Sequence, residues 1–224
     1  MGPAAMQILL PALPIIQDTF QVSNDIAQLT LSLSMFAIAV GTLVYGPLSD
    51  KYGRRPIMLV GLAITLLGSI FCYLANTIEL LIIGRFIQAF GGAVGLVLAR
   101  AIVRDVYGAE DAARVIATLV MVMVVIPMLS PALGGELMGI FGWQSVFIVI
   151  AVLCIVSFLL LIRKLPETLK NPVPFEGIGA MINTFASLFK SRAFCGYAFC
   201  VTFVSVVFFA FISAAPEIMV SVLN

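Results

Sequence analysis

Seven long apolar runs divide the chain, and they limit its fold more than any other feature of the sequence. They cover roughly residues 4–16, 29–48, 57–75, 80–103, 115–141, 146–162 and 194–222. A helix needs about 20 mainly apolar residues to cross the hydrocarbon layer of a bilayer. The strands of a membrane barrel would be about half as long and would alternate apolar with polar residues. The sequence therefore predicts an all-α membrane protein.

The composition excludes several classes of function. Hydrophobic residues make up 62% of the 224 residues and charged residues 10%, against about 45–50% and 25% in soluble domains, which excludes a soluble enzyme and a disordered chain. Twelve basic residues against eleven acidic ones indicate no nucleic-acid partner. The sequence has no histidine, and its four cysteines lie inside apolar runs. We therefore expect no metal site, no cofactor and no histidine-based catalysis.

The charges of the connecting segments predict the orientation. The segments 17–28, 76–79 and 142–145 contain no lysine or arginine. The basic residues gather in the other connections: Lys51, Arg54, Arg55, Arg104, Arg114, Arg163, Lys164, Lys170, Lys190 and Arg192. Basic residues are enriched in cytoplasmic loops. We therefore expect a multi-pass membrane protein with the N-terminus in the cytoplasm.

One long connection indicates the domain organisation. Residues 163–192 are rich in proline and charge and follow the sixth run. We expect a six-helix bundle over residues 1–162, a cytoplasmic linker over 163–192 and the first helix of a second bundle over 193–224. Within the linker, apolar residues at helical spacing over 175–189 predict a helix lying on the membrane surface. The layout is typical of transporters built from two six-helix halves.

The connection between the second and third runs carries the clearest motif, with Gly46, Asp50, Gly53, Arg54 and Arg55 at fixed spacing. It resembles the G-x-x-x-D-[RK]-x-G-[RK]-[RK] signature of the major facilitator superfamily. The first glycine would let another helix approach closely, and the second permits a tight turn. The carboxylate could accept from a helix N-terminus or pair with a cation. The resemblance implies that these residues act in a conformational switch.

Asp105, at the end of the fourth run, is expected at the same depth as Arg54 and Arg55. We predict an ion pair there that breaks when the cytoplasmic side of the transporter opens. The alternative is a screened surface charge of little energetic value.

The fourth run contains Arg85 and Gln88 on one helix face, and Gly91, Gly95 and Ala99 as a small-residue seam. The segment is similar to the superfamily's R-x-x-Q-G-x-G motif. A charge inside a membrane costs about 2.5 kcal/mol or more unless it is paired or reaches water. The resemblance implies that both polar side chains face a central cavity.

The fifth run contains Ser130, Pro131, Gly134 and Gly135. It resembles the antiporter motif G-P-x-x-G-G, with serine in place of the first glycine. A proline bends a helix, and glycines admit a neighbouring helix.

The first run resembles the D-M-Y-L-P-A-L-P segment of the bicyclomycin and chloramphenicol efflux branch, although Gln7 stands where the acid usually is. The resemblance covers the N-terminal half of such a transporter and its seventh helix, so the C-terminal half is expected to be missing.

Family resemblance implies proton-driven export of hydrophobic, drug-like molecules across the bacterial cytoplasmic (inner) membrane by alternating access, with the proton gradient as energy source. Because glutamine cannot carry a proton, Gln7 leaves the coupling group open. We expect Glu136, about as deep as Arg85, to interact with that arginine across the bundle and to take part in proton transfer. The alternative is that Glu136 faces the outer interface and is solvated.

Four alternatives follow. One is a truncated half that does not transport unless a partner completes it, and a less favoured one is an uptake symporter of the same superfamily. A seven-span receptor would have its N-terminus outside, opposite to the loop charges. A membrane-embedded enzyme would need catalytic groups at one depth, where Glu136 alone is suggestive.

Overall fold

The chain folds into helices in a computed structural model that describes residues 8, 12–169, 179 and 186–222. These described residues contain no strand. The helices are α2 (Leu13–Phe20), α3 (Asn24–Tyr52), α4 (Arg54–Tyr73), α5 (Ile78–Phe141), α6 (Ser145–Lys164) and α8 (Arg192–Val222). The all-α membrane fold is confirmed.

Local signals set the ends of these helices. Ser23 precedes α3, Asp25 lies in its first turn and Lys51 in its last, so both charges favour the helix dipole. Thr77 caps α5 by accepting a hydrogen bond from the backbone N–H of Leu80.

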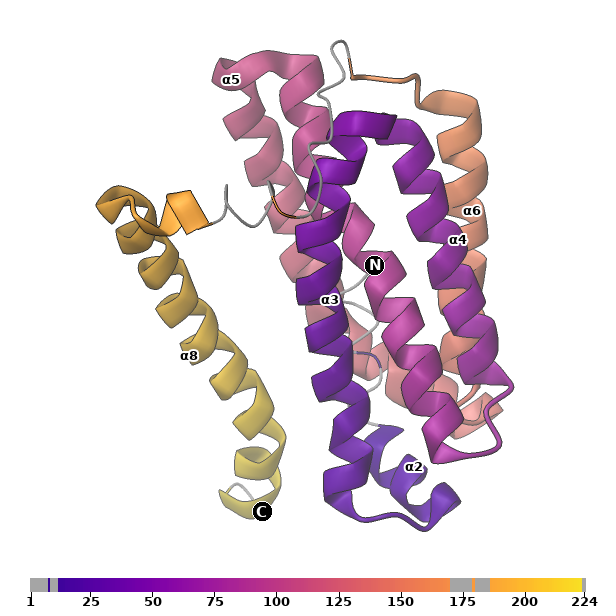
Figure 1. The fold of residues 1–224 in the computed structure, drawn as a ribbon. Coiled ribbons are helices and arrows are strands. Elements are labelled where there is room, and N and C mark those ends of the chain that lie inside the picture. Colours follow the sequence, from indigo (N-terminus) through magenta and orange to yellow (C-terminus); the bar gives the residue numbers. More distant parts are fainter. Residues whose placement is uncertain (1–7, 9–11, 170–178, 180–185, 223–224) are drawn as a thin grey trace. The chain divides into compact units, whose positions relative to one another are not determined.

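A single residue reverses the chain inside α5. Gly108 has φ 72° and ψ −179°, a conformation that glycine adopts without steric cost. Figure 1 shows the chain turning back at this point, so that α5 comprises two consecutive helices. The sequence predicts a loop over residues 104–114, but helical backbone occupies this segment on both sides of the glycine.

Four described helices are long and apolar enough to cross a membrane: Asn24–Tyr52, Arg54–Tyr73, Ile78–Gly108 and Ser145–Lys164. Their outward side chains are apolar as well, for example Leu153, Val156 and Leu160 on α6. Large exposed apolar faces of this kind are stable against lipid and not against water. The chain is therefore a multi-pass membrane protein.

The chain divides into two compact units, residues 1–175 and 176–224. The division falls within the expected linker 163–192, whose exact limits stay a prediction. Most of the expected surface helix over 175–189 lies outside the described residues.

Glycines allow α4 and the first part of α5 to pack closely. A Cβ atom added at Gly91 would lie 2.5 Å from the backbone nitrogen of Thr65 and 2.6 Å from the carbonyl oxygen of Gly61. A Cβ at Gly61 would lie 2.5 Å from Val94, whereas at Gly95 it would meet nothing within 4 Å. Within the described bundle, the predicted close contact is therefore made by Gly91 and not by Gly95. Its partner on α4 is the backbone of Gly61 and Thr65.

We expect Gly91→Ala to destabilise the bundle by about 1–3 kcal/mol, since the new methyl group would force backbone apart. The matched control is Gly95→Ala, one turn further along the same helix, which has open space. Thermal unfolding of the purified protein in detergent should show a lower midpoint for the first variant only. Equal midpoints for the two variants would contradict the packing described here.

Candidate functional site

The end of the bundle that carries Arg54 and Arg55, called here the basic end, is held by a buried guanidinium group. Arg54 is only 4% exposed. Its Nη1 lies 2.6 Å from Asp50 Oδ1 and donates at 2.6 Å to Ser49 Oγ, and its Nε donates at 3.0 Å to Asp105 Oδ2. One side chain therefore ties the end of α3, the start of α4 and the middle of α5 together.

The ion pair expected at Asp105 is present, and Arg54 is its partner. Arg55 has a different contact, because its Nη2 donates at 2.7 Å to the carbonyl oxygen of Ile162 near the end of α6. The two adjacent arginines thus link α4 to different helices. The breaking of the Arg54–Asp105 pair during a transport cycle stays a prediction.

The two glycines of this motif differ in their surroundings. Gly53 has φ 102°, so the tight turn expected there is present between α3 and α4. A Cβ at Gly46 would lie 3.9 Å from Val97, an ordinary contact. A larger residue would therefore fit at this position, and the close helix approach expected at Gly46 is not seen within the described bundle.

The sequence reasoning missed Glu167, which follows α6. Its carboxylate accepts hydrogen bonds from the backbone N–H groups of Arg54 (2.9 Å) and Arg55 (3.1 Å). Burial raises the pKa of this carboxyl, but the backbone hydrogen bonds outweigh burial and hold the pKa below its ordinary value. A signal was available, since an acid follows Pro166 directly beyond the sixth apolar run.

A second polar group lies inside the bundle. Arg85 is 1% exposed and Gln88 is 2% exposed. Arg85 Nη1 donates to Gln88 Oε1 at 2.6 Å, and Gln88 Nε2 donates to Ser69 Oγ on α4 at 2.8 Å. The arginine is therefore buried within the protein and does not extend outward to the membrane surface. Side chains of this kind inside a membrane span are functional candidates.

Glu136 lies near the C-terminal end of α5 and is exposed. No described contact joins it to Arg85, whose hydrogen bond to Gln88 occupies Nη1. Arg85 is buried whereas Glu136 is exposed, and no ion pair between these two described residues is formed in this structure. A role of Glu136 in proton transfer stays a prediction.

The residues of the expected antiporter motif are only partly described. Ser130 is buried, and a Cβ at Gly134 would lie 2.6 Å from the carbonyl oxygen of Ile8. Gly134 thus permits the close approach of the Ile8 backbone, whereas a Cβ at Gly135 would meet nothing within 4 Å. The side chain of Pro131 and all of Gln7 lie outside the described residues, so their expected roles stay predictions.

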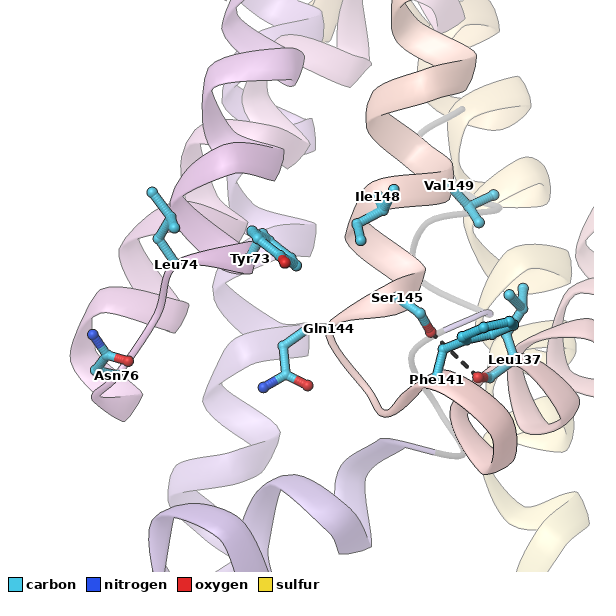
Figure 2. A pocket seen from close by; sticks show the side chains of 9 residues that line it. All are labelled: Tyr73, Leu74, Asn76, Leu137, Phe141, Gln144, Ser145, Ile148 and Val149. Atoms are coloured by element: carbon cyan, nitrogen blue, oxygen red, sulfur yellow. Dashed lines mark hydrogen bonds between the residues drawn. The ribbon is translucent and has the colours of Figure 1, made fainter.

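A cavity of about 620 Å³ opens at the opposite end of the bundle, between the C-terminal ends of α4 and α5 and the start of α6 (Figure 2). Figure 2 shows the side chains that line it: Tyr73, Leu74, Asn76, Leu137, Phe141, Gln144, Ser145, Ile148 and Val149. The lining contains no charged residue and includes neither Arg85 nor Gln88. This cavity is therefore separate from both polar groups described above.

Comparison with known proteins agrees with these observations. The family model described as "Major Facilitator Superfamily" matches residues 2–224. An uncharacterized MFS-type transporter, YdgK, of Bacillus subtilis (strain 168) is 35% identical over 96% of this chain and 54% of its own length. The bicyclomycin resistance protein homolog of Haemophilus influenzae is 29% identical over 98% of this chain and 56% of its own.

Two further similarities complete the comparison. The multidrug resistance protein MdtL of Escherichia coli O81 is 30% identical over 99% of this chain and 56% of its own. The crystal structure of the human organic anion transporter MFSD10 (TETRAN) superposes with a TM-score of 0.64 at 20% identity, over 80% of this chain and 49% of that one, and shares the fold. The chain spans about half the length of the curated relatives it matches.

We expect Asp105→Asn to lower the free energy of unfolding by about 1–3 kcal/mol, because the buried Arg54 would lose one of its two charged acceptors. Cysteines placed beside Arg85 and Gln88 should then react at altered rates with a water-soluble maleimide. The control is Asp111→Asn, an exposed carboxylate further along α5. Identical labelling in the two variants would show that the ion pair does not bias the resting conformation.

Proposed function

The chain belongs to the major facilitator superfamily, and we propose that, within a complete transporter, it exports hydrophobic drug-like molecules in exchange for protons. The membrane would be the bacterial cytoplasmic membrane, with the N-terminus and the basic end in the cytoplasm. The concentration of lysine and arginine in one set of connections supports this orientation. The transport mechanism would be alternating access.

The observation that carries the proposal is the buried Arg85–Gln88–Ser69 group inside an apolar bundle. A charge kept in a membrane interior at this cost is expected to serve binding or coupling. The drug-resistance names of the Haemophilus and Escherichia relatives favour an exported drug as substrate. The substrate would bind in a central cavity between the two halves of the transporter, and an apolar cavity with few polar groups would accept a broad range of substrates.

The basic end would act as the switch. Arg54 joins Asp50 on α3 to Asp105 on α5, and the Arg54–Asp105 pair depends on the start of α4 staying beside α5. When the cytoplasmic side opens, these two segments separate and the Arg54–Asp105 pair breaks. Asp50, Gly53, Arg54, Arg55 and Asp105 are thus proposed to set the balance between the two access states.

The complementary half is the partner that the proposal requires. Alternating access by rocking of two helix bundles needs both bundles around a central cavity. This chain spans about half the length of its curated relatives. The alternative is a half-transporter that binds a separate complementary half. The mass of the product expressed from the native locus distinguishes these cases. A product near 24.0 kDa would favour a separate half, and one of about twice that mass would favour a single complete chain.

The native product should raise the resistance of a pump-deficient bacterial strain to chloramphenicol or bicyclomycin. It should also lower accumulation of the drug in the cells, and a protonophore should abolish this effect because the gradient drives export. Empty vector and an Arg85→Leu variant are the controls. Higher accumulation in cells making the protein would instead favour the uptake symporter of the same superfamily.

We expect Glu136→Gln to lower proton-coupled export about a hundredfold, the effect typical of losing a proton-transfer group. Expression and folding should be unchanged, since the side chain is exposed. The matched control is Glu79→Gln, an exposed carboxylate in the first turn of α5. An unaltered pH dependence of export in the Glu136 variant would assign the proton to another group.

A further inference from the structure

Helix α4 begins without a capping side chain of its own. Its N-cap residue is Gly53, and no side chain near it in sequence accepts from the first turn. The first backbone N–H groups of a helix have no partner within the helix, and they carry the positive end of its dipole. A partner from elsewhere in the chain is therefore needed.

Glu167 supplies that partner from a position 113 residues further along the chain. Oε1 accepts from the N–H of Arg54 at 2.9 Å, and Oε2 accepts from the N–H of Arg55 at 3.1 Å. Each oxygen thus binds one of the first two N–H groups of α4. Hydrogen bonds from backbone N–H groups to an ionised carboxylate are stronger than those between neutral groups.

The same carboxylate also orders the start of the linker. Oε1 accepts from the backbone N–H groups of Thr168 and Leu169, both at 3.0 Å. The hydroxyl oxygen of Thr168 is shielded from solvent at this junction. One carboxylate therefore holds two segments against each other, namely the first turn of α4 and the residues that follow α6.

Gly53 has a second role in this contact besides its backbone conformation. A Cβ atom at this position would lie 2.5 Å from Glu167 Oε2 and 3.0 Å from its Cδ. A side chain at this position would displace the carboxylate, which ends a flexible side chain, in addition to the strain of φ 102°. The glycine of the motif and an acid outside the motif are sterically matched.

The residues that Glu167 holds by their backbone are those that hold the bundle by their side chains. Arg54 reaches Asp50 and Asp105, and Arg55 reaches the carbonyl oxygen of Ile162. A shift of the first turn of α4 would therefore move the ion pairs and the start of the linker together.

We propose that Glu167 is a positioning residue of the conformational switch, which fastens the start of the linker to the first turn of α4 so that the two move as one body. The proposal deepens the proposed function, because it assigns a mechanical connection to the same alternating-access cycle. The carboxylate acts through Arg54, Arg55 and the linker backbone and does not itself contact the substrate.

The attachment is tested by the reactivity of the shielded position 168. Thr168→Cys is introduced with Cys195→Ser and Cys200→Ser, which leaves the buried Cys72 and Cys154. Inside-out vesicles are treated with a membrane-impermeant maleimide. We expect Glu167→Ala to raise the labelling rate about tenfold, as for a segment released from local structure, and Glu167→Asp to raise it less. The control, Glu110→Ala, removes an exposed carboxylate of α5. Equal rates in all variants would overturn the proposal.

The steric match is tested by a double-mutant cycle. Gly53→Ala should raise the labelling rate, because the new methyl group displaces the carboxylate. Adding Gly53→Ala to Glu167→Ala should raise the rate by less than Gly53→Ala does alone, since the carboxylate is already absent and only the backbone strain of φ 102° remains. Fully additive effects would overturn the assignment of Gly53 as the partner of Glu167. Size-exclusion profiles in detergent identify any variant that has failed to fold.

Transport by the native product tests the role in the switch. We expect Glu167→Ala to lower kcat for export while KM stays close to that of the unmutated protein, with partial rescue by Glu167→Asp. Faster labelling with unchanged kcat would overturn the positioning role. If the unmutated protein exports nothing, the proposed function fails, whereas the labelling rates still decide whether Glu167 fastens the linker.

Discussion

The structure depends on one buried cation, the guanidinium group of Arg54. A charge shielded from water needs a counter-charge or hydrogen bonds, because its hydration is lost. Asp50 on α3 and Asp105 on α5 provide the pairing at 2.6 and 3.0 Å. The end of α3, the start of α4 and the middle of α5 must therefore meet at one point. An apolar bundle in lipid gains little from the hydrophobic effect between its helices, so a polar contact of this kind is well placed to fix their arrangement.

Close packing and the buried polar group depend on the same residues. A Cβ at Gly68 would collide with the backbone of Gln88, so the absence of a side chain lets α4 and α5 approach each other. That approach brings Ser69 within 2.8 Å of the Gln88 amide, which in turn accepts from Arg85. The small residues thus do more than fill space. They set the distance at which a polar network can form in a membrane interior.

Two polar layers therefore cross an otherwise apolar bundle, one at the basic end and one around Arg85. The first joins α3, α4 and α5 through ion pairs, and the second consists of side chains less than 3% exposed. In the proposed alternating access, the first would serve as a gate while the second keeps its geometry. Glu167 adds the linker to the first layer, at the point from which the chain continues toward its second unit.

The sequence alone determined the helical membrane fold, the family and most members of the basic end, because apolar run length and motif spacing are local properties. It also indicated that Asp105 would meet an arginine, since both stand at the same end of their runs. The tertiary structure decided that the partner is Arg54 and that Arg55 turns to Ile162. It also decided that Glu136 stays apart from Arg85 and that Glu167 caps α4. These contacts join residues up to 113 positions apart, and such pairings depend on how helices pack and rotate, which no local pattern of residues specifies.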